Sequence, residues 1–394
     1  MNNIISYIEE YGDRTFEEFP FNEVDSLVLC QLSYLNYEGF VGGFDSENPV
    51  TEVTKIYEAP NRDDILKGYW YTNNNRELFA AFATSDRFKD TKMAYYEQII
   101  NESADAQFSA VTYILPDKNI YVAYRGTDAT LIGWKEDMKL AYSEPLRSQE
   151  LAADYLDRVA DHVSGSFRIG GHSKGGNLAV YAAMFCAHDT RKRVIEIFDN
   201  DGPGFRPEIL KEGHFASIRN RIHKFIPKSS IVGILLADEI EYEVIECWSV
   251  GALQHNSYVW KSNEGQFVRS KGMTNTKIRY DSALNEWIYS LSDVEVSTFI
   301  DALFDVLTAS DAKNVFDLIK DPTKSVASAF AAYKEMDQKA KDTLRTILKR
   351  LIEINEEKVL EEFVEKSRAL KEEMKSWQED ASSFMTKTIT KMKP

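Results

Sequence analysis

The sequence predicts an α/β protein in which a mostly parallel sheet is flanked by helices and followed by a C-terminal α-helical region. Three observations support this prediction. Between Phe108 and His255, short β-branched and aromatic runs alternate with segments of helical spacing, which is typical of a parallel sheet covered by helices. A glycine-flanked serine stands where one of these strands meets the next helix. From Leu291 onward, apolar residues keep a helical spacing among many Glu and Lys residues, so we expect a sheet domain over 1–290 and helices over 291–394.

The expected elements follow from spacing and from turn residues. Asn22 is expected to cap a helix whose apolar face begins at Leu27, and residues 66–100 are expected to be mainly helical. Ser292 to Glu295 form a capping box that starts a helix beyond the sheet. The other expected elements are a hairpin over 109–115 and 119–124, helices over 149–163, from 178, over 208–220 and over 344–377, and strands over 166–169, 193–198, 222–226 and 242–250.

The charge of the chain restricts its partners. Its 394 residues carry a formal net charge of −16, and the pI is near 5.0. Such an acidic surface repels phosphate backbones, so nucleic acid is not an expected partner. With 43% hydrophobic residues the chain can bury a substantial core, which excludes a wholly disordered protein.

The cysteines and the N-terminus bear on the cellular compartment. Cys30, Cys186 and Cys247 lie far apart without C-x-x-C spacing, which favours free thiols in a reducing compartment. The N-terminal residues lack the basic start and apolar core of a secretion signal. No run approaches the roughly 18 apolar residues of a membrane-spanning helix. The sequence therefore predicts a cytoplasmic protein with no integral membrane segment.

Residues 169–178 read Ile-Gly-Gly-His-Ser-Lys-Gly-Gly-Asn-Leu and contain the pattern G-x-S-x-G centred on Ser173. This pattern places a nucleophilic serine on a sharp turn between a strand and a helix. Gly171 and Gly175 suit the turn because they lack Cβ atoms and let strand and helix approach each other. We predict that Ser173 is a nucleophile.

A serine nucleophile needs a base, which in proteins with this turn is a histidine that comes late in the chain. Six histidines are available. His172 directly precedes the nucleophile and is expected to point away from the substrate. His255 stands just past the last clear strand of the sheet, so His255 is the predicted base.

The group that orients this histidine stays open between several residues. Asp199 and Asp201 follow the strand after the serine turn, although Asp-Gly-Pro-Gly also favours a turn whatever the function. The loop after strand 222–226 contains Ser230 and no carboxylate before Asp238. We take Asp201 as the candidate acid and Ser230 as an alternative orienting group.

An oxyanion hole needs two preorganised N–H donors where negative charge develops. One is expected from the backbone amide of Lys174, directly after the nucleophile. The other is expected from Gly126 and Thr127, after an early strand, where the hydroxyl of Thr127 would add a donor. The alternative for this segment is a plain strand-ending turn. No ligand cluster with metal-binding spacing appears, so neither a metal nor an organic cofactor is expected.

The motifs Tyr-Arg-Gly-Thr at 124–127, Gly-His-Ser-Lys-Gly-Gly at 171–176 and Gly-Pro at 202–203 resemble those of the class-3, fungal-type lipases. More closely, the chain resembles a bacterial lipase-like family, the Mbeg-like family, described as a domain of unknown function. The matching segments lie between Asn22 and Trp260, and they are 107–110, 124–128, 133–137, 171–181, 201–205, 230–233 and 254–255.

This resemblance implies an α/β-hydrolase fold over 1–290, with Ser173 as nucleophile and His255 as base. It also implies an oxyanion hole made by Thr127 and Lys174. Class-3 lipases carry their acid in the loop after the penultimate strand, where this chain has Ser230. Either Ser230 orients the histidine, or Asp201 substitutes for the acid, or the site is a weakened dyad.

The predicted function is that of a serine hydrolase of the lipase or esterase type, cleaving carboxylic esters, acyl lipids included, through an acyl-enzyme on Ser173. The alternative is a catalytically weak or inactive hydrolase-fold protein that binds a lipid or a protein partner. The Ser230 departure and the acidic, amphipathic C-terminus favour this alternative. The expected partners are therefore a small-molecule or lipid ester and a protein bound through the C-terminal helices.

Overall fold

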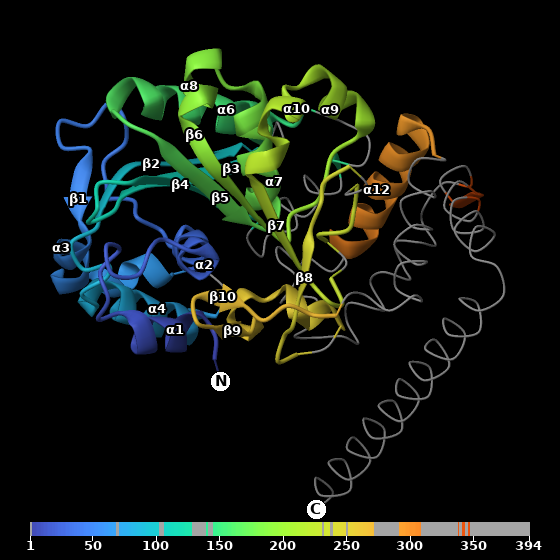
Figure 1. Cartoon of the computed structure of the whole chain (residues 1–394). Helices are drawn as coiled ribbons and strands as arrows, with labels where there is room; N and C mark the ends of the chain where they lie inside the picture. Colours follow the sequence, from blue (N-terminus) through green and yellow to red (C-terminus); the bar gives the residue numbers. More distant parts are fainter. Residues whose placement is uncertain are drawn as a thin grey trace, which may run out of the picture.

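The computed structural model describes residues 2–67, 71–101, 106–127, 139–140, 145–230, 232–236, 239–249, 251–271 and 291–308, together with 338, 341, 342 and 346. In this part of the chain an eight-stranded sheet lies between two layers of helices (Figure 1). The strands, which follow one another in space in chain order, are β1 (Val50–Glu52), β2 (Lys92–Asn101), β3 (Ala106–Ile114), β4 (Ile120–Tyr124), β5 (Phe167–His172), β6 (Val194–Asn200), β7 (Ile222–Pro227) and β8 (Glu243–Ile245).

The sheet has an antiparallel half and a parallel half. β1 to β4 pair antiparallel, and β4 to β8 pair parallel. Four of the seven strand pairs in the described sheet are therefore parallel, which confirms the predicted mostly parallel sheet flanked by helices. The expected hairpin is β3 and β4, and its turn is closed by a hydrogen bond from Lys118 N to Leu115 O of 2.8 Å.

Helices of the parallel half all cover one face of the sheet (Figure 1). Parallel strands that follow one another in space through right-handed crossovers place every connecting helix on the same side. These helices are α6 (Arg147–His162), α7 (Lys174–Phe185), α8 (His188–Arg193), α9 (Pro207–Glu212) and α10 (Phe215–Ile218).

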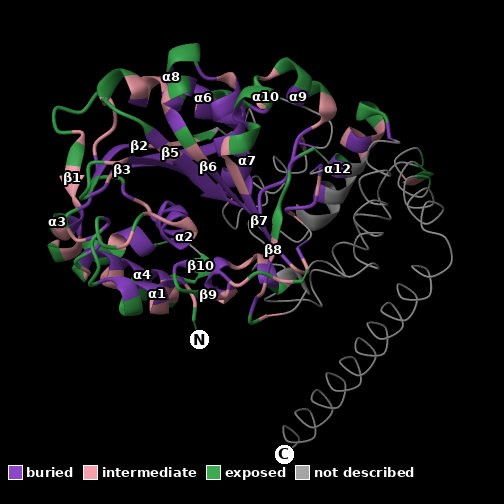
Figure 2. Cartoon of the chain, viewed as in Figure 1, coloured by how far each residue is buried: buried purple, intermediate pink, exposed green. Residues whose placement is uncertain are grey.

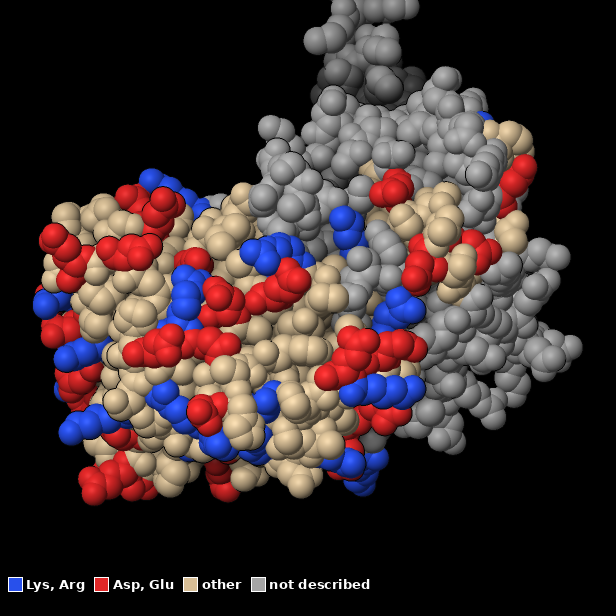
Figure 3. Space-filling model, turned by 90° about the horizontal axis from the view of Figure 1, so that it is seen from above, with Lys and Arg blue, Asp and Glu red and all other residues tan. Residues whose placement is uncertain are grey.

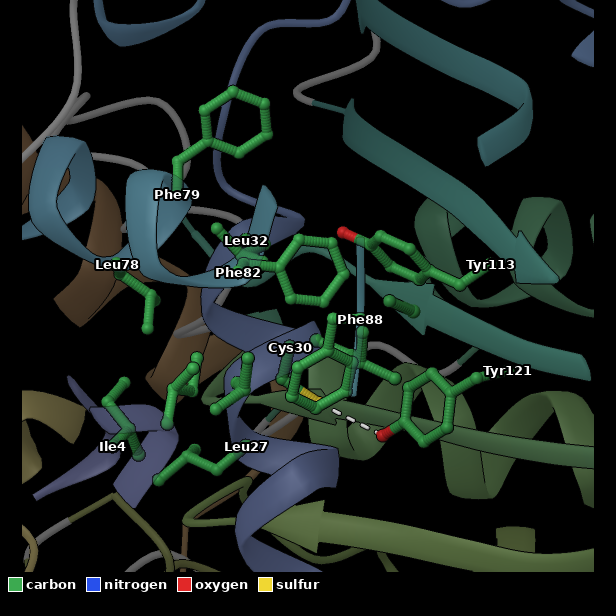
Figure 4. Packing of buried hydrophobic residues seen from close by; sticks show 14 of the residues in the cluster. Ile4, Leu27, Cys30, Leu32, Leu78, Phe79, Phe82, Phe88, Tyr113 and Tyr121 are labelled. Atoms are coloured by element: carbon green, nitrogen blue, oxygen red, sulfur yellow. Dashed lines mark hydrogen bonds between the residues drawn. The ribbon is translucent and has the colours of Figure 1, made fainter. Parts of the chain in front are cut away.

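The opposite face is covered by helices from the N-terminal part of the chain. They are α1 (Ile4–Tyr11), α2 (Glu23–Leu32), α3 (Val53–Glu58) and α4 (Thr72–Thr84). As predicted, Asn22 caps α2, and its side chain accepts hydrogen bonds from Val24 N and Asp25 N. Figure 4 shows Leu27 and Cys30 of α2 packed with Phe82 of α4. We call α1, α2 and α4 the N-terminal helical layer.

β4 illustrates how one strand serves both layers. Tyr121 and Ala123 belong to the core under the N-terminal helical layer, whereas Ile120, Val122 and Tyr124 belong to the core under α6 and α7. Successive side chains of a strand point to opposite faces, so a strand buried on both sides is apolar throughout. β4 is buried along its whole length, and Figure 2 shows the greater part of the neighbouring central strands buried as well.

Three expected elements differ from the structure. Residues 66–100 are not mainly helical, because α4 ends at Thr84 and β2 occupies Lys92–Asn101. Pairing with β3 makes Lys92–Asn101 a strand rather than a helix, since runs rich in tyrosine and isoleucine form a strand when a partner strand is present. The strand expected over 242–250 is only Glu243–Ile245. The helix expected over 208–220 is interrupted at Gly213, which ends α9.

Beyond the sheet, α12 spans Asp293–Thr308 and begins with the predicted capping box. Ser292 N donates to Glu295 Oε2 at 2.9 Å, and Ser292 Oγ donates to the same atom at 2.8 Å. Val296 and Ile300 of α12 are buried. The tract expected to be helical over 344–377 lies outside the described residues except for 346, and the division into 1–290 and 291–394 stays an expectation.

Short elements complete the described chain: the 3-10 turns η1 (Arg62–Leu66), η3 (Arg219–Arg221), η4 (Gly251–His255) and η5 (Ser257–Val259), and a small hairpin of β9 (Ser262–Asn263) and β10 (Gln266–Phe267).

On the face seen in Figure 3, acidic and basic side chains are interspersed. None of the helices in the described ranges is long and apolar enough to cross a membrane.

Candidate active site

Ser173 stands on the turn between β5 and α7 in a strained backbone conformation. Its φ is 59° and its ψ is −134°, a region that residues with a side chain rarely occupy. The turn is held by a hydrogen bond from Ser173 N to Asn200 O of 2.9 Å, at the end of β6. Strain at a residue that its surroundings hold in place is typical of functional sites.

The two glycines of the pattern are required by contact. A Cβ added to Gly171 would lie 2.1 Å from the carbonyl carbon of Gly175, and one added to Gly175 would lie 2.2 Å from Tyr124 O. These distances are far below van der Waals contact, so a larger residue at 171 would separate β5 from α7, and one at 175 would separate α7 from β4. The strand–turn–helix context expected from the sequence is therefore present around Ser173.

Asp201 lies at the carboxyl end of β6 and contacts the predicted base. Its Oδ2 is 2.6 Å from His255 Nδ1, and its side chain is fully buried. Its backbone has a φ of 60° and is fixed by a hydrogen bond from Asp201 N to Phe225 O of 2.8 Å. The hydroxyl of Ser230 donates to Asp201 Oδ1. Ser230 thus contacts the carboxylate of Asp201, which in turn contacts His255.

Asp199, the other aspartate of this turn, has a different partner. Its Oδ2 is 2.6 Å from Lys224 Nζ, and neither side chain is exposed. Asp199 Oδ1 accepts a hydrogen bond from Gly202 N at 2.8 Å, and Lys224 Nζ also donates to Gly202 O. Burial raises the pKa of the Asp199 carboxyl, and the Lys224 ammonium acts in the opposite direction. This pair holds the turn that carries Asp201.

His255 ends the turn η4 and keeps part of its ring accessible, with 31% of the side chain exposed. A carboxylate only accepts hydrogen bonds, so the contact with Asp201 places the imidazole proton on Nδ1. Nε2 is then the basic nitrogen, as a general base requires. The adjacent Gln254 fixes the turn, since Ser229 N donates to its Oε1 at 2.7 Å and Trp260 Nε1 donates to its carbonyl at 2.9 Å.

Residues next to Ser173 and His255 contact each other or the other residue's surroundings. The rings of His172 and His255 are 4.7 Å apart, and a Cβ on Gly202, next to Asp201, would lie 2.7 Å from Ser173 O. Within the described residues no hydrogen bond joins Ser173 Oγ to His255. Such bonds are often long in proteins without substrate and shorten when the substrate binds.

The two residues expected in the oxyanion hole flank the serine turn. Lys174 is the first residue of α7, where amide groups point out of the helix N-terminus and favour negative charge. Its side chain runs inward, and Nζ donates to Gln107 O at 3.1 Å. Thr127 is half-buried and follows Gly126, where an added Cβ would lie 2.4 Å from His172 O. That Lys174 and Thr127 bind an oxyanion stays a prediction.

Sequence reasoning missed the surroundings of His172. Its ring does not point away from the site: Nε2 is 2.8 Å from His255 O, and Nδ1 is 3.1 Å from the hydroxyl of Tyr34. Burial and, to a smaller extent, the nearby His255 together lower the pKa of His172 to about 3, so the ring is neutral. Its place inside the G-x-S-x-G pattern was the available signal. Tyr34 gave none, because it is far from the pattern in sequence.

The described residues hold no group of three or more His, Cys, Asp and Glu side chains that could bind a metal ion. The matching segment expected over 133–137, and Asp238, lie outside the described residues.

One protein-family model, Mbeg1-like, matches residues 82–305. This stretch runs from the end of α4 into α12, and it contains Ser173, Asp201 and His255. No curated protein and no solved structure matches the chain. Since the family model covers more than half of the 394 residues, the chain belongs to the lipase-like Mbeg1-like family.

Proposed function

We propose that this protein is a serine hydrolase with an α/β-hydrolase fold that cleaves carboxylic esters through an acyl-enzyme on Ser173. One observation carries the proposal: His255 Nδ1 lies 2.6 Å from the buried carboxylate of Asp201, beside a serine held in a strained turn. A nucleophile, a base and a group that orients the base are the parts that acyl transfer needs.

The proposed reaction assigns each group one task. Ser173 Oγ attacks the ester carbonyl while His255 Nε2 takes the hydroxyl proton. The backbone amide of Lys174, with Thr127, stabilises the oxyanion of the tetrahedral intermediate. Its collapse breaks the bond to the alcohol, which leaves with the proton from His255. A water molecule then attacks the acyl-enzyme by the same route and releases the acid.

The departure from class-3 lipases at position 230 is accounted for in this proposal. Asp201 takes the role of the acid from the turn after β6. Ser230, in the position where those lipases carry their acid, supports it with a hydrogen bond to Oδ1. A hydroxyl donating to one carboxylate oxygen leaves the other free to accept from His255 Nδ1.

The state of the three cysteines supports a cytoplasmic location. Cys30, Cys186 and Cys247 are free and buried. Burial raises the pKa of each of these thiols to about 12, which keeps them protonated and unreactive. Free thiols are typical of a reducing compartment, so we propose a cytoplasmic location.

The second candidate is a hydrolase-fold protein without turnover that binds a lipid or a protein partner, with the C-terminal helices as the contact. One observation favours it: no hydrogen bond joins Ser173 Oγ to His255 within the described residues. The two candidates differ in whether Ser173 reacts with an electrophile.

A fluorophosphonate probe separates these candidates, because it labels only an activated serine. We expect labelling of the purified full chain that Ser173→Ala abolishes and His255→Ala strongly reduces. Ser217→Ala and His188→Ala serve as matched controls, because both residues are exposed on the far helices. If the wild-type protein is not labelled, or if Ser173→Ala is labelled equally, the hydrolase proposal is wrong. Esters of increasing acyl length then define the substrate.

A further inference from the structure

His172 lies between two parts of the molecule that meet at the site. On one side its Nε2 is 2.8 Å from the carbonyl oxygen of His255. On the other its Nδ1 is 3.1 Å from the hydroxyl of Tyr34, which follows α2. The edge of Trp260 contacts the ring, with ring centres 6.0 Å apart. The ring is therefore fixed by a polar contact at each nitrogen and by an aromatic neighbour.

The hydrogen bonds determine which nitrogen of His172 carries the proton. A backbone carbonyl can only accept, so Nε2 must be the donor toward His255 O. The ring is buried and neutral, because burial lowers its pKa to about 3, so it carries one N–H. Nδ1 is then an acceptor that faces the hydroxyl of Tyr34, which also donates to the backbone oxygen of His172 at 3.3 Å. The carbonyl of His255 thus selects the tautomer, and Tyr34 holds the residue from the other side.

This contact complements the one that Asp201 makes. Asp201 holds the ring of His255 through Nδ1, whereas His172 holds its backbone through the carbonyl. A ring fixed at only one atom can still rotate with the turn that carries it. With both contacts in place, Nε2 keeps its position toward the nucleophile, and displacements of about 1 Å are known to lower rates by roughly 100-fold.

The N-terminal helical layer also contacts η5, the turn that follows the one ending at His255, at two places. Ser257 Oγ donates to Gln31 Oε1 of α2 at 2.6 Å, and Tyr258 OH donates to Asn75 Oδ1 of α4 at 2.6 Å. Ser257 and Tyr258 lie two and three residues after His255 in the chain. Tyr34, Gln31 and Asn75 all precede residue 82, where the match to the family model begins. The layer therefore contacts the segment that follows the base, and Tyr34, directly after α2, contacts His172.

We propose that His172, bonded through Nε2–H to the carbonyl of His255 and held on its other side by Tyr34, is a positioning residue that fixes the backbone of His255 and so aims its imidazole at Ser173. The proposal rests on the proposed hydrolase function for its effect on rate. Its effect on the geometry of His255 is independent of turnover. It makes the N-terminal helical layer part of the catalytic apparatus.

A pair of substitutions at His172 tests the hydrogen bond apart from the volume of the ring. In His172→Gln the side-chain amide can still donate to His255 O, whereas in His172→Leu it cannot. We expect His172→Leu to lower the rate of fluorophosphonate labelling of Ser173 by about tenfold or more, and His172→Gln to stay within a few-fold of wild type. His188→Leu, at an exposed position, is the matched control.

A spectroscopic measurement reads the geometry directly. The proton shared by His255 Nδ1 and Asp201 gives a downfield imidazole N–H resonance in the NMR spectrum, which is assigned by its loss in Asp201→Asn. We expect this resonance to shift or broaden in His172→Leu and to persist in His172→Gln. If the two variants lose the resonance and the labelling rate equally, or if folded His172→Leu keeps both at wild-type values, the proposal is overturned.

A replacement variant and a readout independent of labelling cover the cases in which His172→Leu does not fold or the wild type is not labelled. If His172→Leu does not fold, Tyr34→Phe takes its place, because it removes one hydroxyl and leaves the ring. A reduced labelling rate with an altered His255 resonance supports the proposal, and wild-type values of both overturn it. If the wild-type protein is not labelled at all, the hydrolase function fails, and the resonance alone decides whether His172 positions His255.

Discussion

Two buried acid–base pairs connect different parts of this molecule. At the N-terminal helical layer, Arg87, which follows α4, contacts Asp25 of α2 through two hydrogen bonds, Nε–Oδ1 of 2.8 Å and Nη2–Oδ2 of 2.5 Å. At the carboxyl edge of the sheet, Lys224 contacts Asp199 with Nζ–Oδ2 of 2.6 Å. None of the four side chains is exposed. Both pairs thus bear a desolvation cost that only complete hydrogen bonding can offset.

The pairs differ in what they hold. Arg87 also donates to Phe19 O at 2.8 Å and lies over the ring of Phe16, so it joins α2 to the segments around it. The Asp199–Lys224 pair closes on both backbone groups of Gly202, directly after Asp201. The first pair therefore acts on the fold alone, whereas the second acts on the fold and on the site. Breaking each pair separately tests this distinction.

The largest effect is expected at Asp201, which the second pair holds in place. In Asp201→Asn the amide favours the wrong tautomer of His255, and we expect the rate of ester hydrolysis to fall by about 10⁴-fold. The Asp199–Lys224 pair remains, so the circular-dichroism melting curve should stay cooperative. Asp189→Asn, at an exposed position, is the control. A rate within a few-fold of wild type would remove Asp201 from the proposed mechanism.

Lys224→Met is expected to damage both fold and site. It leaves Asp199 buried without its cation, which costs about 3–5 kcal/mol of unfolding free energy. It also releases Gly202 O, so the turn with Asp201 is less well held, and labelling of Ser173 per folded molecule should decrease. Urea unfolding and probe labelling under folding conditions measure the two effects. A purely structural role would lower stability and leave labelling per folded molecule unchanged.

Arg87→Met is the counterpart in the N-terminal helical layer. The unpaired Asp25 should again cost about 3–5 kcal/mol of unfolding free energy. Because Arg87 touches none of the proposed catalytic residues, labelling per folded molecule should equal that of wild type. The same urea and labelling measurements apply. Equal losses of labelling in Arg87→Met and Lys224→Met would contradict the distinction between the pairs.

The carboxyl edge of the sheet and the N-terminal part of the chain also differ in how well the sequence predicts them. The serine turn follows from local rules, because G-x-S-x-G requires a short strand before it and a helix after it. His255 follows from its place after the last strand. The sequence names Asp201 as the candidate acid without excluding Asp199, since both lie in one turn and their partners, His255 and Lys224, are distant in the chain.

The N-terminal half shows where local patterns fail. β2 was expected within a helical segment, because its apolar residues fit either period until β3 is placed beside it. Likewise, nothing near Tyr34 indicates a role at the site, since its contact with His172 depends on how α2 packs on the sheet. Long-range pairing, rather than composition, determines both features.

His172 offers a third case beside the pairs Asp25–Arg87 and Asp199–Lys224, because its side chain is buried but neutral rather than paired with a charge. Its pKa in the folded protein is about 3, below the ordinary value of 6.5. The unfolded chain therefore takes up a proton at this residue as the pH falls below 6.5, while the folded chain does not until near pH 3. The stabilisation from this residue is present above pH 6.5 and is lost progressively toward pH 3.

His172→Gln removes this titration while keeping a donor toward His255 O. Between pH 6 and pH 4 the unfolding free energy of wild type should fall more steeply than that of His172→Gln, by about 1.4 kcal/mol per pH unit. Carboxylates and the other histidines titrate alike in both proteins, so the difference of slopes isolates this residue. His188→Gln, whose ring is exposed, should keep the wild-type slope. Identical slopes for wild type and His172→Gln would mean that His172 is readily protonated in the fold, and its nitrogen Nδ1 would then not be the acceptor that faces Tyr34.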